Sequence, residues 1–214
     1  MIKSGTIKKL LSAALAFVLV TTPAICVNAT GDDGGDGTSN STVTAEEAAA
    51  VPTTSSVTVD GKVVATTVSG AYLSNTVPGV AVTTGMAAIS QGYALESGAK
   101  PYVRVYDISE KQSPAAYASI NAVADSIGAR VIASVNLELG SILNSKFTLL
   151  SQDGTPINIS FAIPKKALSA GSTYAIICVR PGGVFEVLPD LDDDPNTVTF
   201  DTTGGLGAYA IVVY

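Results

Sequence analysis

The chain has 214 residues, of which 12 are basic and 18 acidic, and it contains two cysteines but no histidine and no tryptophan. The missing histidine excludes Ser-His-Asp and Cys-His nucleophile systems and removes the usual imidazole ligands of zinc. The net charge of −6 argues against the basic patch that nucleic acids require, so we expect no nucleic-acid partner. We therefore expect a protein that is not an enzyme, and whose partner is an extracellular protein or a glycan.

Residues 1–29 have the pattern of a secretory signal peptide. A basic start precedes the apolar run 10–20, and small residues at 27–29 provide a cleavage site. The apolar run is shorter than the roughly 20 residues that span a bilayer, so we expect no membrane insertion after cleavage. This segment holds three of the 12 basic residues and no acidic one, which leaves 9 basic and 18 acidic residues and a net charge of −9. We expect a secreted, extracellular protein that associates with the cell surface.

Residues 30–54 are rich in glycine, aspartate, serine and threonine and contain few side chains that could be buried. This composition predicts a flexible linker. We expect the folded domain to occupy residues 55–214, in which a sub-boundary could fall near 110–130.

The first folded segment has the pattern of a β-hairpin. Valines alternate with a polar residue along 57–59, Asp60-Gly61 supplies a two-residue turn, and apolar residues return at 63–64. Further short extended runs follow, and the turn dipeptide Pro78-Gly79 interrupts them.

Strict alternation marks a strand at 102–107. Tyr102, Arg104 and Tyr106 fall on one face, and the valines between them fall on the other face together with Asp107. We expect one of the two faces to be buried. Two tyrosines that flank an arginine form either a binding stripe or an ordinary half-buried sheet face.

The pattern predicts one helix, over 114–127. Ser113 suits the N-cap position, Pro114 the first helical position and Gly128 the stop. Apolar residues recur at 116, 120, 123 and 127, so we expect this side of the helix to pack on a sheet.

Short extended runs with glycine and proline turns between them fill residues 130–214. Cys178 lies in one of these apolar runs. It is the single cysteine left after residue 29, so it cannot form an internal disulfide, and we expect it to be buried. Many short strands at even spacing predict a mainly β fold, an immunoglobulin-like antiparallel β-sandwich with one short α-helix packed on it.

The stretch 164–214 resembles the C-terminal β-sandwich modules of secreted bacterial surface proteins. The motifs that carry the resemblance are Ile163-Pro164, Leu168, Gly171, Tyr174, Gly183, Glu186, Leu188, Asn196 to Phe200, Thr202 and Tyr209-Ala210-Ile211. The middle of the chain, from the predicted helix to "VNLELG", resembles a small group of uncharacterised secreted bacterial proteins. The resemblance implies a sandwich and an exported setting, and it implies no catalytic residue.

The acidic loop, residues 188–202, carries the strongest metal-like pattern. Asp190, Asp192 and Asp194 stand at alternate positions and could hold calcium together with backbone carbonyls. An EF-hand is excluded for two reasons. Pro195 occupies the position that needs glycine, and the extended segment that follows carries Asp201 roughly 16 Å from Asn196, too far to close a compact ligand shell. The alternative is a solvated acidic turn. Calcium is the only cofactor that the sequence suggests.

Three functions compete. The leading hypothesis is a secreted, non-catalytic binding or interaction module, because the residue types of most catalytic sites are missing. The second is a carboxylate-based hydrolase of the glycosidase kind, with Glu138, Glu186 and Asp107 as candidates. The third is a structural subunit that assembles by strand addition through the apolar segment 208–214.

Overall fold

The computed structural model describes residues 50–214, and the predicted signal peptide and most of the predicted linker lie outside the described residues. Residues 50–214 belong to one compact unit. Its first described backbone contacts lie inside the predicted linker, because the carbonyls of Pro52 and Thr53 accept hydrogen bonds from the amides of Tyr72 and Gly70.

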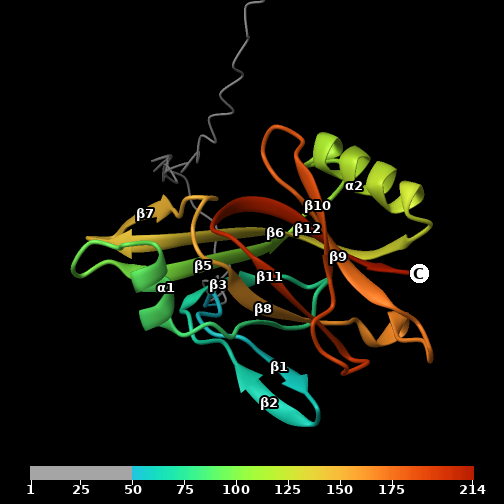
Figure 1. Cartoon of the computed structure of the whole chain (residues 1–214), viewed down its shortest axis with the longest axis horizontal. Coiled ribbons are helices and arrows are strands. Elements are labelled where there is room, and N and C mark those ends of the chain that lie inside the picture. Colours follow the sequence, from blue (N-terminus) through green and yellow to red (C-terminus); the bar gives the residue numbers. More distant parts are fainter. Residues whose placement is uncertain (1–49) are drawn as a thin grey trace, which may run out of the picture. The chain divides into compact units, whose positions relative to one another are not determined.

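The larger layer is a seven-stranded sheet, here called the main sheet (Figure 1). Its order is β10 (Phe185–Pro189), β9 (Tyr174–Val179), β12 (Gly205–Val213), β6 (Arg130–Leu143), β5 (Lys100–Asp107) and β3 (Gly70–Leu73), and β7 (Lys146–Leu149) also pairs with β6. All pairs are antiparallel except β3 with β5. The strand β6 pairs with β12 along 130–139 and with β5 along 135–142, so it joins the two halves of the sheet.

The smaller layer is a three-stranded sheet of β11 (Thr197–Thr202), β8 (Ile157–Ala162) and β4 (Val80–Val82), accompanied by the hairpin of β1 (Ser56–Val59) and β2 (Lys62–Ala65). The main core lies between the layers. There the rings of Phe161 and Phe200 pack edge to face at 5.0 Å, with Tyr209 beside both. The alternating apolar residues of the strands create this core because successive side chains point to opposite faces of a sheet.

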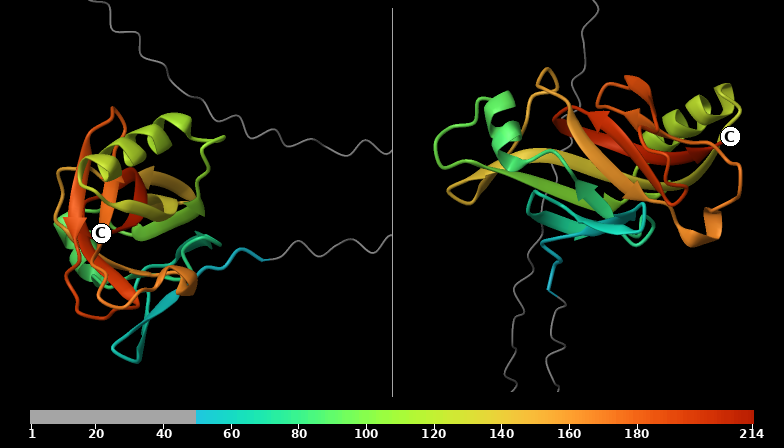
Figure 2. Two further views of the ribbon diagram at one scale, coloured as in Figure 1. Left: turned by 90° about the vertical axis from the view of Figure 1, so that its right-hand side faces the viewer. Right: turned by 60° about the horizontal axis from the view of Figure 1, so that its bottom comes forward.

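The opposite face of the main sheet, here called the helix face, carries α2 (Pro114–Ser126) (Figure 2). Ile120, Val123 and Ala124 are the buried residues of this helix, and they pack against β9 and β12. Gly128, just beyond the helix, has φ +68°, a left-handed conformation that suits glycine and allows the chain to turn into β6.

The structure confirms the prediction of a mainly β sandwich with a short helix packed on it. The predicted hairpin turn is also present, since Asp60 and Gly61 both have positive φ between β1 and β2. Two features were not predicted: the parallel pairing of β3 with β5, and the short helix α1 (Met86–Gly92). A 3-10 helix at Lys165–Ala167 completes the described elements. The segment near 110–130, where a sub-boundary could fall, contains α2 and packs on the sheet within the compact unit.

The last strand, β12, lies inside the main sheet. It pairs with β6 along one edge and with β9 along the other, with a register shift between Ile211 and Val212. The apolar segment that the strand-addition hypothesis used is therefore fully paired within its own chain, and an added strand would need a different edge.

Candidate functional site

The helix α2 covers only part of the helix face. It packs on β9, β12 and one end of β6, whereas the part formed by β5, β7 and the rest of β6 carries no helix. Five side chains gather on this uncovered part and are here called the tyrosine-arginine cluster: Tyr102, Arg104, Tyr106, Glu138 and Phe147. The valines of β5 point the other way and are buried in the core. The alternating strand therefore turns its tyrosine face outward.

The members of the cluster hold one another in place. Arg104 lies directly across from Glu138 in the β5–β6 register, and its Nη1 is 3.4 Å from Glu138 Oε2. The hydroxyl of Tyr106 donates to Glu138 Oε1 at 2.8 Å. The Arg104 guanidinium carbon lies 3.9 Å from the centre of the Phe147 ring, and Tyr102 meets that ring edge-on at 6.1 Å. Partly exposed contacts of these kinds contribute only about 0.5–1 kcal/mol each, so their main effect is to fix the side-chain rotamers.

Gly140 makes the cluster geometrically possible. It lies across from Tyr102 in the register, and a Cβ at this position would come within 2.4 Å of the Phe147 ring and 2.6 Å of the Thr148 carbonyl oxygen. The bare backbone therefore leaves the space that the phenyl ring occupies beside Arg104.

Tyr106 keeps its proton throughout the physiological pH range. Burial raises its pKa, and the hydrogen bond to Glu138 and the charge of that carboxylate raise it further, to about 12. At neutral pH the hydroxyl therefore stays a hydrogen-bond donor, fixed on the Glu138 carboxylate.

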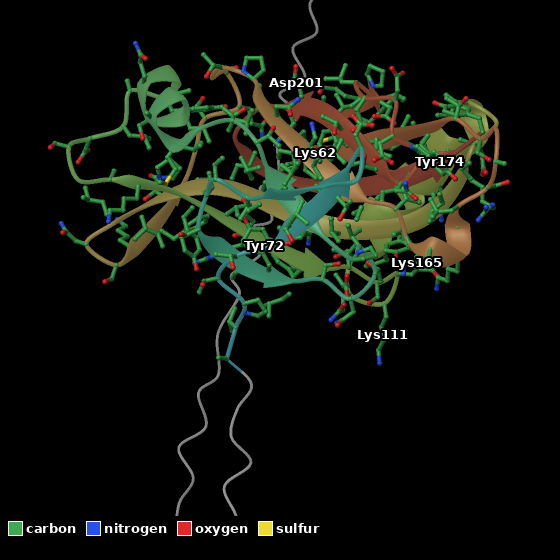
Figure 3. All side chains as sticks on the ribbon, turned by 90° about the horizontal axis from the view of Figure 1, so that it is seen from below. Lys62, Tyr72, Lys111, Lys165, Tyr174 and Asp201 are labelled. Carbon is green, nitrogen blue, oxygen red and sulfur yellow. The ribbon has the colours of Figure 1, made fainter. Side chains whose placement is uncertain are left out.

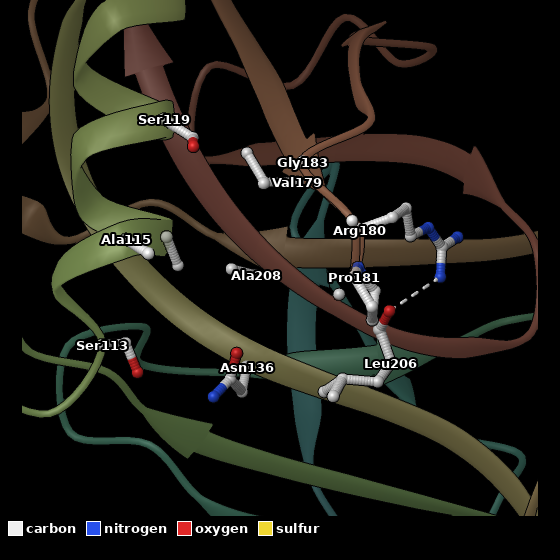
Figure 4. Close-up of a pocket in the computed structure, with 13 residues that line it drawn as sticks. Ser113, Ala115, Ser119, Asn136, Val179, Arg180, Pro181, Gly183, Leu206 and Ala208 are labelled. Carbon is white, nitrogen blue, oxygen red and sulfur yellow. Dashed lines mark hydrogen bonds between the residues drawn. The ribbon is translucent and has the colours of Figure 1, made fainter. Parts of the chain in front are cut away.

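A pocket of about 310 Å³ adjoins the cluster at the start of α2. Asn136 connects the two features, because it lines the pocket and lies directly across from Tyr106. Polar groups of Ser113 and Ser119 share the lining with apolar side chains such as Leu206 and Ala208, from β12 (Figure 4). The cluster and the pocket thus form one continuous surface on the helix face, part platform and part depression.

Arg180 supports the far wall of this pocket. Its side chain turns away from the helix, toward the carbonyl of Leu206 (Figure 4). The buried guanidinium donates to the Gly204 carbonyl at 2.9 Å, the Thr203 carbonyl at 3.1 Å and the Thr202 hydroxyl at 2.8 Å. These partners satisfy the buried donors and hold the turn between β11 and β12 in place.

The three alternating aspartates of the acidic loop, Asp190, Asp192 and Asp194, accept hydrogen bonds from the chain itself. Asp190 Oδ1 accepts from the amides of Asp192 and Thr199, at 3.2 and 2.9 Å. Asp192 accepts from the amide of Asp194 at 2.8 Å and from the hydroxyls of Thr197 and Thr199.

The innermost aspartate joins the loop to the first hairpin. Asp194 is buried, and its carboxylate accepts hydrogen bonds from Asn196 and from the amide of Asp60. Burial would raise its pKa, but these hydrogen bonds outweigh burial and lower it. Burial raises the pKa of Asp190. Asp201 lies on β11 (Figure 3). Asn158, on the neighbouring β8, donates to its carboxylate at 2.9 Å.

Within residues 50–214, no group of three or more acidic, histidine or cysteine side chains has an arrangement that could hold a metal ion. The hydrogen bonds explain why aspartates alternate here: each carboxylate accepts from backbone amides of the turn itself. Calcium binding by Asp190, Asp192 and Asp194 stays a prediction.

The three carboxylates of the hydrolase hypothesis lie on different parts of the molecule. Glu138 belongs to the cluster on the helix face. Asp107, on the next strand, is across from Val135, whose side chain points into the core, so the Asp107 side chain lies on the core side of the sheet, away from the helix face that carries Glu138. Glu186 is exposed on β10, at the far edge of the main sheet. The structure does not bring these groups together into the pair that such a mechanism needs.

The prediction that Cys178 is buried is confirmed. Burial raises the pKa of its thiol, which keeps it protonated at neutral pH. Sequence reasoning singled out Tyr102, Arg104 and Tyr106 but missed Phe147 and Gly140, whose contribution depends on the pairing of β6 with β7.

None of the helices in residues 50–214 has both the length and the apolar character needed to cross a membrane. No family model, curated protein or solved structure matches this chain. The resemblance of residues 164–214 to the modules of secreted surface proteins therefore stays a prediction.

Proposed function

We propose that this protein is a secreted, non-catalytic binding module, associated with the cell surface, and that its ligand contacts the tyrosine-arginine cluster and the adjoining pocket. One observation carries the proposal: a set of mutually fixed aromatic and charged side chains lies on a sheet face that no described element covers. Fixed side chains lose little conformational entropy when a ligand binds.

The chemistry of this surface favours a glycan over a protein ligand. Tyr102 and Phe147 offer aromatic surface for the C–H faces of a sugar, and Arg104, Glu138 and Asn136 offer hydrogen bonds for its hydroxyls. The pocket of about 310 Å³ is at the lower end of ligand-site sizes, which suits a short saccharide. The net acidic chain also disfavours an anionic polymer as partner.

The test is a glycan array probed with the purified chain and with the double variant Tyr102→Ala/Arg104→Ala. We expect the wild-type chain to bind a defined set of glycans and the double variant to bind them at least tenfold more weakly, a loss of about 1.4 kcal/mol. Arg130→Ala, an exposed position at the other end of β6, is the control with the same change of charge and should bind like the wild type.

Two outcomes would contradict the proposal. Glycan binding that the double variant retains would move the site elsewhere. Binding to no glycan at all, together with cluster-dependent binding to an extracellular protein, would replace the glycan by a protein ligand.

A further inference from the structure

The strand β10 has a free edge. Within residues 50–214 it pairs with β9 along one side and with no strand along the other, and β11 comes alongside its C-terminal end, where the Leu191 amide donates to the Thr199 carbonyl at 2.7 Å. All its residues are exposed except Leu188, which is half-buried and packs against the main core. An open edge of this kind presents backbone amides and carbonyls to any extended segment that comes alongside.

Two hydrogen bonds show which backbone groups of β10 point outward. The amide of Arg180 donates to the Val184 carbonyl at 2.7 Å, and the amide of Tyr214 donates to the Thr173 carbonyl at 3.0 Å. Even-numbered residues of β9 therefore bond to β10, and odd-numbered residues bond to β12. Because antiparallel pairs alternate in this way, the amides and carbonyls of Phe185 and Val187 face the free edge.

The side chains of the same two residues lie on the helix face and are exposed, Phe185 by 55% and Val187 by 39%. Beside them is a second pocket of about 500 Å³, separate from the one near the cluster. Its lining is mostly apolar and aromatic and includes two polar side chains: Tyr174, Ala175, Val187, Pro189 and Tyr214, with Thr173 and Asp190. One edge therefore carries an exposed phenyl group and, a few residues further along, an apolar pocket without an occupant from the described chain.

We infer that β10 pairs with β10 of a second copy of this chain, in an antiparallel two-fold dimer in which each Phe185 enters the other copy's pocket. A two-fold contact uses the same surface on both partners. A protruding side chain and a pocket on one edge therefore meet twice, because each copy's side chain fills the other copy's pocket. The inference goes beyond the proposed ligand site, which comprises the cluster on β5–β7 and the pocket at the start of α2, and it does not depend on that site.

The register follows from the residues on the edge. Centring the pairing on Val187 places Phe185 across from the partner's Pro189, which lines the pocket. Centring it on Glu186 would place two carboxylates directly across from each other, an arrangement that is destabilising in a sheet. Centring it on Phe185 would place Val187 across from the partner's Gly183 and leave the pocket unfilled. Of these three registers, the one centred on Val187 places Phe185 at the pocket and does not place the two Glu186 carboxylates across from each other.

The test measures the mass of the full chain by sedimentation equilibrium over a wide concentration range. We expect a reversible monomer–dimer equilibrium that Phe185→Ala weakens at least tenfold, because a largely exposed phenyl group becomes buried twice in the dimer. Val187→Pro should have a similar effect, because it removes an amide that faces the free edge and bonds to nothing in the monomer sheet. Val63→Ala, on the exposed face of β2, is the control and should leave the dimer intact.

Two results would overturn the inference. The first is a monomer at every concentration. The second is a dimer that survives both Phe185→Ala and Val187→Pro. Melting curves of the monomeric variants that match the wild type would show that the loss of the dimer reflects the interface and not unfolding.

Discussion

Asp107 shows how one carboxylate can organise a turn of the chain. It accepts hydrogen bonds from the Ser74 hydroxyl at 2.6 Å, the Asn75 amide at 2.8 Å and both the amide and the hydroxyl of Thr76. These bonds anchor the segment after β3 to the end of β5. Burial alone would raise the pKa of Asp107, but the four hydrogen bonds outweigh it and the pKa is lowered.

A lowered pKa makes the stability of this protein sensitive to acid. The carboxylate of Asp107 contributes stability above its unfolded pKa of about 3.8, and the contribution is lost as the pH falls through the lower folded value. We expect Asp107→Asn to reduce the free energy of unfolding at pH 7 by about 1 kcal/mol and to flatten its decline below pH 4. Urea unfolding at pH 7 and pH 3 measures both effects. An unchanged difference between the two pH values would contradict the assignment.

The pairing of Tyr106 with Glu138 can be read from a tyrosine titration. Replacing Glu138 by Gln removes the negative charge that opposes ionisation, so we expect the pKa of Tyr106 to fall from about 12 toward the ordinary value of 10.0. The difference in ultraviolet absorbance between wild type and variant during alkaline titration measures the shift. Glu96→Gln removes an exposed carboxylate elsewhere and should leave the titration unchanged.

At the scale of the element, the acidic loop acts as a structured turn whose aspartates bond to its own amides and hydroxyls. We expect Asp192→Ala to lower the free energy of unfolding by about 1–2 kcal/mol in the absence of any metal, because it leaves the Asp194 amide and two threonine hydroxyls without their acceptor. Asp193→Ala, an exposed neighbour, is the matched control.

Calcium provides the opposing test of this loop. If the aspartates serve only as acceptors for the loop's own amides and hydroxyls, the wild-type chain should melt at the same temperature with calcium and with a chelator. A ligand at a hundred times its dissociation constant would add about 2.7 kcal/mol to the stability. A shift of that size that Asp192→Ala abolishes would establish the metal site.

Local patterns predicted the elements that local chemistry determines. The Asp60-Gly61 turn and the helix that starts at Pro114 are both present, because turn residues and helical spacing act over a few positions. The helix α1 was missed, since it has seven residues and buries a single one, Ile89. Short helices of this kind depend on tertiary packing more than on their own sequence.

The candidate site depended on information that no local pattern contains. Alternation placed Tyr102 and Arg104 on one face but could not decide whether that face was buried. The position of α2 determines that this face is exposed, because the helix lies over β9 and β12 and does not cover β5. Glu138 and Phe147 join the cluster only through strand pairing.

At the scale of the whole molecule, the two proposed surfaces belong to one sheet but to different parts of it. The cluster lies on β5–β7 and the free edge is β10, and the pocket that adjoins the cluster lies between them, over β12 and the end of β9. A dimer through β10 would therefore leave the cluster of each copy accessible and would carry two clusters in one particle. Two linked sites can bind a repetitive surface more tightly than either site alone, without any new contact.

The long strand β6 has a consequence for how the chain folds. Its central residue Leu137 pairs with Gly207, which follows it by 70 positions, and Val80 pairs with Phe161, which follows it by 81. Sheets built from such distant partners fold slowly, typically in milliseconds to seconds, because long loops must close before the contacts form. For the secreted protein that we propose, slow folding is an advantage, because a chain that is still unfolded can pass through a narrow export channel.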